Sequence, residues 1–144
     1  MYQLVLPPAQ RADLENWARA GYPLEVCGLL LGRRVGDGAR VERVRSARNL
    51  SVDRAHDRFE LDPLDFLPID AEARESGREI LGVWHTHPDH PARPSETDRA
   101  AAWPGWSYVI LSVAQDGVRD VRSWRLEQGE FVEEAVADEP EAAA

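Results

Sequence analysis

Residues 82–98 read Gly-Val-Trp-His-Thr-His-Pro-Asp-His-Pro-Ala-Arg-Pro-Ser-Glu-Thr-Asp. The first part is an apolar run that ends in His85 and His87, which predicts a buried strand with two imidazoles at its end. Residues two apart in a strand point to the same face of a sheet, so both rings can converge on one metal ion. A proline-containing loop then leads to Ser95 and Asp98, and the Asp98 carboxylate can supply a third ligand. This stretch therefore predicts a metal site where a strand passes into a loop.

Other stretches of strand length lie on both sides of this segment. Residues 24–32 form a nearly continuous apolar run, which is typical of a strand buried on both faces, and Glu25 stands at its beginning. A hairpin signal, Gly-Asp-Gly at residues 36–38, predicts a return strand. Further strands are expected at residues 2–6, 41–46, 59–61, 79–84, 106–113, 118–126 and 131–136. Short turns join the last three, which predicts an antiparallel arrangement there.

Three helices are expected between these strands: one opened by Pro7-Pro8 and ending near Gly21, one at residues 62–77 and one at residues 95–102. The predicted apolar faces are Leu14, Trp17 and Ala18 in the first helix and Leu64, Leu67 and Ala71 in the second. Asp62 is a candidate cap of the second helix, and Pro68 inside it should kink or split it. The order of elements predicts a single-domain α/β (α+β) fold, a three-layer sandwich whose mixed, largely antiparallel sheet is flanked by helices.

The composition describes an ordinary globular domain. A chain of 144 residues with 43% hydrophobic residues has the length and the apolar content of one soluble domain. No apolar run approaches the roughly 20 residues that a membrane span needs, and residues 1–10 lack a secretory signal, so the cytoplasm is the expected compartment. The single cysteine, Cys27, excludes an internal disulfide and paired-cysteine zinc modules, so a metal must be held by histidine and carboxylate.

The net charge of -9 is unevenly distributed. Residues 127–144 hold seven acidic and no basic residues, which leaves 17 basic and 19 acidic residues, or -2, for residues 1–126. An acidic chain with no basic stripe is a poor candidate for binding nucleic acid or an anionic membrane. We expect residues 1–136 to form the folded domain and residues 137–144 to be an acidic, disordered tail.

The predicted metal site has the composition of a catalytic centre. Two imidazoles and one carboxylate leave a fourth coordination position open, whereas a structural zinc site is normally closed by four protein ligands. Hydrolysis also needs a group that accepts a proton from water, and Glu25 is the candidate. Ser95 is the candidate donor to the oxyanion that develops on the attacked carbonyl.

Several of these residues have a second interpretation. The Ser-x-x-Asp pattern at residues 95–98 is also a helix-capping arrangement, and those four residues alone favour the cap; the two roles are compatible. We expect His90 to face solvent or contact substrate, His56 to be an ordinary loop histidine, and Cys27 to be a small buried side chain.

The combined pattern resembles the JAMM (MPN+) metalloprotease family. It consists of Glu25-Val-Cys-Gly, His85-Thr-His-Pro, seven residues between His87 and Ser95, and Asp98 three residues further on. The similarity covers roughly residues 2–126 and implies a cytidine-deaminase-like three-layer fold. The family resemblance implies one zinc ion on His85, His87 and Asp98, water activation by Glu25, and oxyanion stabilisation by Ser95.

The resemblance also implies a class of substrate. Similar family members cut the peptide or isopeptide bond after the C-terminal Gly-Gly of ubiquitin or ubiquitin-like proteins, or trim sulfur-carrier proteins. One alternative is a hydrolase that releases an amino acid such as cysteine from a sulfur-carrier C-terminus, and another is a non-catalytic MPN-type binding module. The short interval between Asp98 and Trp106 lacks room for the long insertion of eukaryotic deubiquitinases. In this respect the chain is similar to the compact bacterial and archaeal members of the family.

Overall fold

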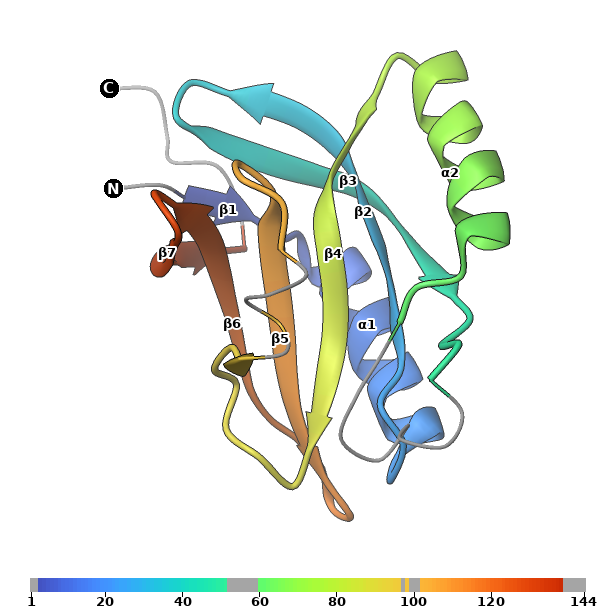
Figure 1. The fold of residues 1–144 in the computed structure, drawn as a ribbon, viewed down its shortest axis with the longest axis vertical. Helices are drawn as coiled ribbons and strands as arrows, with labels where there is room; N and C mark the ends of the chain where they lie inside the picture. The colour runs from blue at the N-terminus through green and yellow to red at the C-terminus, as the bar shows by residue number, and fades with distance from the viewer. Residues whose placement is uncertain (1–2, 52–59, 97, 99–101, 139–144) are drawn as a thin grey trace.

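The computed structural model describes residues 3–51, 60–96, 98 and 102–138. Within them, two helices and seven strands follow one another along the chain (Figure 1): β1 Gln3–Val5, α1 Pro8–Gly21, β2 Cys27–Val35, β3 Gly38–Ala47, α2 Pro63–Glu75, β4 Glu79–Pro88, β5 Ser107–Ala114, β6 Gly117–Glu127 and β7 Glu130–Ala137. Of the third predicted helix, the described residues Glu96 and Asp98 are helical. His56 and residues 139–144 of the predicted tail lie outside the described residues.

The strands form one closed mixed barrel in the order β1-β3-β2-β4-β5-β6-β7. Closure depends on β1, which pairs in parallel with β3 along one edge and with β7 along the other. The predicted three-layer sandwich of helices flanking an open sheet is therefore wrong. The physical reason is that β1 is three residues long and uses both of its edges. A sequence pattern shows which residues can form a strand, but it does not show how many neighbours that strand has.

Helix α1 packs against the barrel through the apolar face that its sequence predicts. Leu14 and Ala18 are fully buried, and Trp17 stacks on Trp84 of β4 with ring centroids 5.4 Å apart and planes 10° apart. Their cluster includes Leu4, Leu6, Leu30, Val41, Leu81, Val109, Leu111 and Val113. Burying one such side chain contributes about 1.5–3 kcal/mol. This cluster therefore fixes the side of β4 that faces α1.

The same tryptophan explains why residue 28 of β2 has to be a glycine. Trp84 donates its indole N–H to the carbonyl oxygen of Arg45 at 3.0 Å, and its ring therefore lies across Gly28. A Cβ atom at Gly28 would overlap both the Arg45 carbonyl oxygen and the Trp84 indole nitrogen. The absence of a side chain at residue 28 lets β2, β3 and β4 stay in register, with Cys27 opposite His85.

Helix α2 begins at the predicted cap. An Asp62 carboxylate oxygen accepts from the Leu64 N–H at 2.9 Å, which satisfies one of the free N–H groups of the first turn. The helix continues from Pro63 to Glu75, so Pro68 does not split it.

The apolar face predicted for α2, made of Leu64, Leu67 and Ala71, is wrong because all three side chains are exposed. Ile69 and Ala73 are buried instead and pack with Leu29, Leu31, Ile80, Val83 and Tyr108. Apolar residues occur around much of this helix, so its sequence does not single out the buried face. Packing on the barrel decides it.

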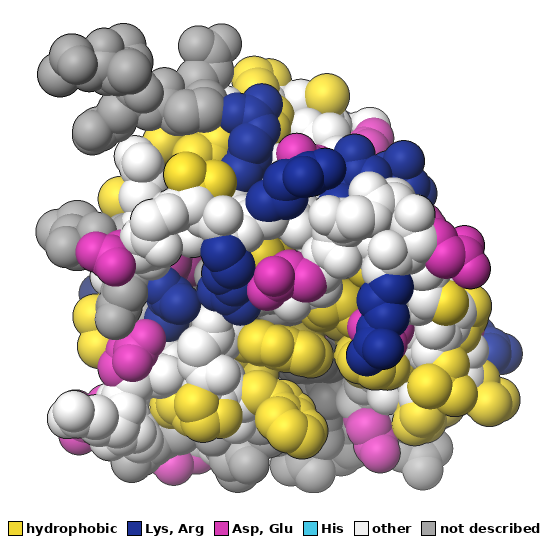
Figure 2. All heavy atoms as spheres, turned by 90° about the horizontal axis from the view of Figure 1, so that it is seen from above, with side chains coloured by type: hydrophobic (Ala, Val, Ile, Leu, Met, Phe, Trp, Pro, Cys, Tyr) yellow, Lys and Arg dark blue, Asp and Glu magenta, His cyan; other side chains and the backbone are white. Residues whose placement is uncertain are grey.

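Arginine and acidic side chains are interspersed at the end of the molecule that carries the β2–β3 hairpin (Figure 2). Arg33 and Arg78 both pair with Glu42, and Arg34 pairs with Glu79. The positive charge at this end is therefore partly neutralised. In the described part of the chain, neither helix is long and apolar enough to cross a bilayer.

Candidate metal centre

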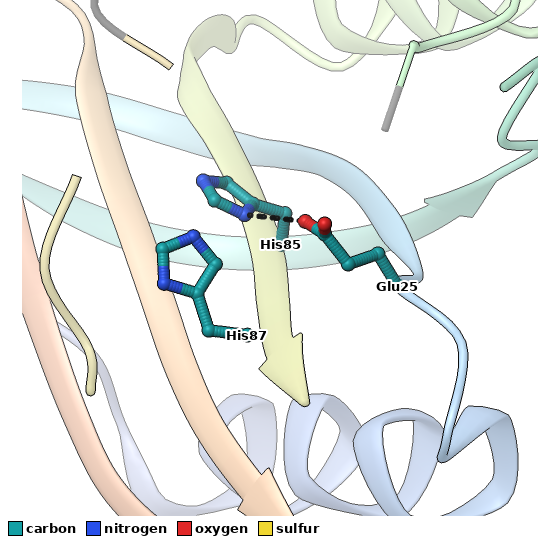
Figure 3. A group of neighbouring side chains, drawn as sticks. All are labelled: Glu25, His85 and His87. Atoms are coloured by element: carbon teal, nitrogen blue, oxygen red, sulfur yellow. Dashed lines mark ion pairs between the residues drawn. The ribbon is translucent and has the colours of Figure 1, made fainter. Parts of the chain in front are cut away.

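Strand β4 carries two histidines into a buried position near its end. His85 and His87 are 0% and 9% exposed, and their ring centroids are 5.0 Å apart. Figure 3 shows both imidazoles on the same side of the strand, as expected for residues two apart. The neighbouring residues Trp84 and Thr86 belong to the opposite side of β4. The strand therefore separates the two imidazoles from the core around α1.

Glu25 reaches this position from the segment between α1 and β2. Its carboxylate is 4% exposed, and Oε1 lies 3.7 Å from Nδ1 of His85 (Figure 3). The potential ligand atoms of Glu25, His85 and His87 all lie within 4.8 Å of one another. A buried carboxylate beside two imidazoles is costly without a balancing cation. The donor set therefore fits a metal ion, as the spacing of the histidines predicts.

Asp98 brings a second carboxylate to the same two rings. Its Oδ1 lies 3.6 Å from Nε2 of His85, and its Oδ2 lies 3.2 Å from Nε2 of His87. Burial alone would raise the pKa of Asp98, but the hydrogen bond with His87 and the charge of His85 lower that pKa to about 2. Asp98 is therefore ionised over the whole neutral range, and the ionised form is the one that binds a metal.

Ser95 and Asp98 cap each other. The Ser95 N–H donates to Asp98 Oδ2 at 2.8 Å, and the Asp98 N–H donates to Ser95 Oγ at 3.1 Å. This reciprocal pair confirms the predicted capping arrangement. It also fixes the Asp98 carboxylate beside His87, while Ser95 itself is exposed at the edge of the site.

The ring of His87 is oriented by the loop that follows it. Its Nδ1 lies 2.9 Å from the carbonyl oxygen of Pro91. A carbonyl only accepts, so Nδ1 carries the hydrogen, and Nε2 is the atom available to a metal. Burial lowers the pKa of His87, but the hydrogen bonds with Asp98 and Pro91 outweigh burial and raise it.

The two carboxylates approach different atoms of the imidazoles. Asp98 faces Nε2 of both His85 and His87, whereas Glu25 faces Nδ1 of His85. Two imidazoles and one carboxylate are enough to hold a divalent ion with one position open. The arrangement therefore leaves the other carboxylate available to carry a proton.

Two further residues hold the backbone beside Glu25, and the sequence pattern did not single them out. Thr86 Oγ1 accepts from the Val26 N–H at 3.0 Å, and the Thr86 N–H donates to the Val26 carbonyl at 3.0 Å. The Asn49 side-chain amide donates to the Glu25 carbonyl at 3.1 Å. These contacts join residues more than 20 positions apart, so only the pairing of β2, β3 and β4 reveals them.

The remaining candidates, His90 and Cys27, are not among the residues whose potential ligand atoms meet. His90 is exposed, and its carbonyl accepts from the Ser112 hydroxyl at 2.5 Å. Cys27 is buried as predicted, and burial, with the charge of Glu25, raises the pKa of its thiol to about 12. Cys27 is therefore a protonated thiol at neutral pH.

The fold and the site define a JAB-type protein. Residues 8–127 match the family described as prokaryotic homologs of the JAB domain, and the chain belongs to this family. The resemblance predicted from the motif is thereby confirmed.

Two relatives and one solved structure extend over nearly the whole chain. The chain is 35% identical to the desampylase of Haloferax volcanii over 142 residues, covering 95% of this chain and 97% of that protein. It is 31% identical to the CysO-cysteine peptidase of Mycobacterium tuberculosis over 141 residues, covering 94% and 91%. A solution structure of a Desulfitobacterium hafniense protein superposes with a TM-score of 0.79 at 36% identity, covering 94% and 91%.

Proposed function

We propose that this chain is a zinc-dependent peptidase or isopeptidase that hydrolyses the bond after the C-terminal Gly-Gly of a ubiquitin-like or sulfur-carrier protein. The observation that carries the proposal is the meeting of two imidazoles and two carboxylates at one buried position, in a chain of the JAB family. The names of the two relatives support the class of substrate. We assign this activity to the domain formed by residues 1–136.

His85, His87 and Asp98 are the proposed zinc ligands. Asp98 is chosen over Glu25 because its two oxygens face Nε2 of both histidines, and because Ser95 fixes its orientation. Zinc bound there would act as a Lewis acid that makes water more acidic and polarises the scissile carbonyl.

Glu25 is the proposed general base and acid. It takes a proton from the attacking water as the water oxygen bonds to the carbonyl carbon, and it gives that proton to the amine nitrogen as the carbon–nitrogen bond breaks. One Glu25 carboxylate oxygen lies within 4.8 Å of one nitrogen of each imidazole, which supports this role.

Ser95 is the proposed donor to the developing oxyanion. Its oxygen accepts from the Asp98 N–H, so its hydroxyl hydrogen can be donated to a substrate oxygen. Its exposed position at the edge of the buried donor set is where a substrate carbonyl would arrive.

The short connection after the site supports a small substrate. Only residues 99–106 separate Asp98 from β5, which is too little chain for a long substrate-gripping insertion. A second candidate, release of an amino acid such as cysteine from a sulfur-carrier C-terminus, is favoured by the similarity to the CysO-cysteine peptidase. The complete set of donor residues argues against a non-catalytic binding module.

The test compares two substrates on the purified, zinc-loaded protein: a linear Gly-Gly-tailed carrier with one added amino acid, and the same carrier linked to a lysine side chain. We expect cleavage after Gly-Gly that a chelator abolishes and zinc restores. The preferred substrate shows which of the two candidate activities the protein has.

Glu25→Gln should keep zinc and lose hydrolysis by several orders of magnitude. A zinc-loaded protein that cleaves neither substrate would refute the proposed activity, and a protein that binds no zinc would favour the binding module.

A further inference from the structure

We propose that Thr86 and Asn49 are positioning residues that hold the Glu25–Val26 peptide group from both ends and thereby aim the Glu25 carboxylate. This inference rests on the proposed function, because it assigns Glu25 the proton transfer. The contacts that carry it join the side chains of Thr86 and Asn49 to the backbone around Glu25, and none of them uses a proposed zinc-ligand atom.

Glu25 needs such support because it lies outside the regular strand. Strand β2 begins at Cys27, and Cys27 opposite His85 is the last registered pair of the β2–β4 ladder. A base in proton transfer must lie within hydrogen-bond reach of its target, and a misplacement of about 1 Å can cost on the order of 100-fold in rate. The orientation of the backbone at Glu25 therefore has to be fixed by other contacts.

The peptide group between Glu25 and Val26 has two polar groups, and a side chain binds each of them. Asn49 Nδ2 donates to the Glu25 carbonyl oxygen at 3.1 Å. The Val26 N–H donates to Thr86 Oγ1 at 3.0 Å. Since the peptide group is planar, fixing its two ends fixes the rotation of the backbone between the Glu25 Cα and the carbonyl.

Both supporting side chains are themselves held in place. Thr86 is fully buried in β4, and its N–H donates to the Val26 carbonyl at 3.0 Å. Asn49 accepts, through Oδ1, the N–H groups of Ser51 at 2.9 Å and Glu60 at 2.8 Å. Thr86 stands between His85 and His87, so the residues that present the imidazoles and the residue that orients Glu25 move as one strand.

Three variants separate the hydrogen bonds from the shape of the side chains. Thr86→Val keeps the branched shape and removes the acceptor for the Val26 N–H, whereas Thr86→Ser keeps the acceptor and is the matched control. Asn49→Asp keeps the oxygen that binds Ser51 and Glu60 and removes the donor to the Glu25 carbonyl. Each variant is measured for kcat and KM on the cleaved Gly-Gly substrate, for zinc content, and for hydrogen exchange of the Val26 amide by NMR on the zinc-free protein.

We expect Thr86→Val and Asn49→Asp to lower kcat about 10- to 100-fold with KM within about threefold and zinc content unchanged. Thr86→Ser should stay within about threefold of the wild type. The Val26 amide should exchange at least about tenfold faster in Thr86→Val than in the wild type and in Thr86→Ser.

Two results would overturn the inference while leaving the proposed function intact. One is a wild-type kcat in folded Thr86→Val or Asn49→Asp protein; the other is a Thr86→Ser variant as impaired as Thr86→Val. If Thr86→Val does not fold, the kcat of Asn49→Asp decides between the two outcomes: a lowered kcat supports the inference and a wild-type kcat overturns it. Failure of the proposed function looks different, because the wild-type protein itself would then cleave neither Gly-Gly substrate.

Discussion

The imidazole Nδ1 of His87 lies 2.9 Å from the carbonyl oxygen of Pro91, four residues further along the chain. This hydrogen bond closes the loop after β4 back onto the strand and turns Nε2 of His87 toward Asp98. The His87 ring thus contacts the loop twice, at the Pro91 carbonyl and at the Asp98 carboxylate that the loop brings to the site. The hydrogen bond with Pro91 therefore fixes the orientation of the His87 ring relative to Asp98.

Replacing the carboxylates of Asp98 and Glu25 one at a time should show which of them binds zinc and which acts as the general base. We expect Asp98→Asn to lose bound zinc, while Glu25→Gln retains it. Zinc at 100 times its dissociation constant should stabilise the wild type and Glu25→Gln by about 2.7 kcal/mol, and Asp98→Asn much less. Metal analysis and thermal unfolding with and without zinc measure this. The reverse pattern would make Glu25 the third ligand.

Substitutions of Ser95 should separate the cap from the oxyanion donor. Ser95→Ala removes both, so we expect kcat to fall about 100- to 1000-fold and the free energy of unfolding to fall by about 1 kcal/mol. Ser95→Gly, the control, should lose as much kcat and only a few tenths of a kcal/mol, because glycine is a tolerated cap. Steady-state kinetics and urea denaturation provide both values. A fully active Ser95→Ala protein would exclude the hydroxyl from the reaction.

Adding one methyl group at Gly28 should disrupt the junction of three strands. The new Cβ would overlap the Arg45 carbonyl and the Trp84 indole nitrogen, so we expect Gly28→Ala to lower the free energy of unfolding by about 3 kcal/mol or more. Gly36→Ala is the control: its φ is +57°, and its Cβ would meet no atom within 4 Å among the described residues, so only backbone strain of about 1 kcal/mol applies. Urea denaturation compares the two, and equal losses would contradict the packing argument.

Glu72 should stabilise the protein in a pH-dependent way. It accepts hydrogen bonds from Arg45 at 2.8 and 2.6 Å and from Arg43 at 3.0 Å, and these contacts lower its pKa below the ordinary value of 4.5. Because the folded pKa is the lower one, the stabilisation is complete well above pH 4.5 and disappears as the pH falls through the folded pKa.

We therefore expect Glu72→Gln to lower the free energy of unfolding by about 1 kcal/mol at pH 7, a modest value because these groups are 30–40% exposed. The difference from the wild type should shrink as the pH falls below 4.5 and should be lost once the pH lies below the folded pKa of Glu72. Urea denaturation across this range measures the effect, with the exposed Glu75→Gln as control. A difference that persists unchanged in acid would assign the effect to packing rather than to charge.

Cys27 should resist thiol reagents in the folded protein. Burial, with the charge of Glu25, raises the pKa of its thiol to about 12, and the thiolate is the reactive form. At pH 8 we expect iodoacetamide to modify the native chain at least about 100-fold more slowly than the chain in urea. Mass spectrometry follows the reaction without ambiguity, since the chain has one cysteine. Rapid native modification would show that the region opens.

Local spacing was enough to find His85, His87 and Asp98, but not the architecture around them. The His-x-His pattern works because a strand has a period of two, and the Ser95–Asp98 cap works because it is local. The closure of the barrel by β1, the buried face of α2 and the contact of Thr86 with Val26 depend on which strands are neighbours. That information is carried by the packing of distant residues, such as Trp17 on Trp84, and has no period along the chain.

Strand β4 alternates between two tasks, with Trp84 and Thr86 on one face and His85 and His87 on the other. A slip of the strand by one residue would exchange the indole for an imidazole, so register and chemistry are inherited together. The face of β4 that carries no ligand is therefore part of the site: Trp84, stacked on Trp17 and bonded to the Arg45 carbonyl, helps to hold the strand in the register that presents His85 and His87.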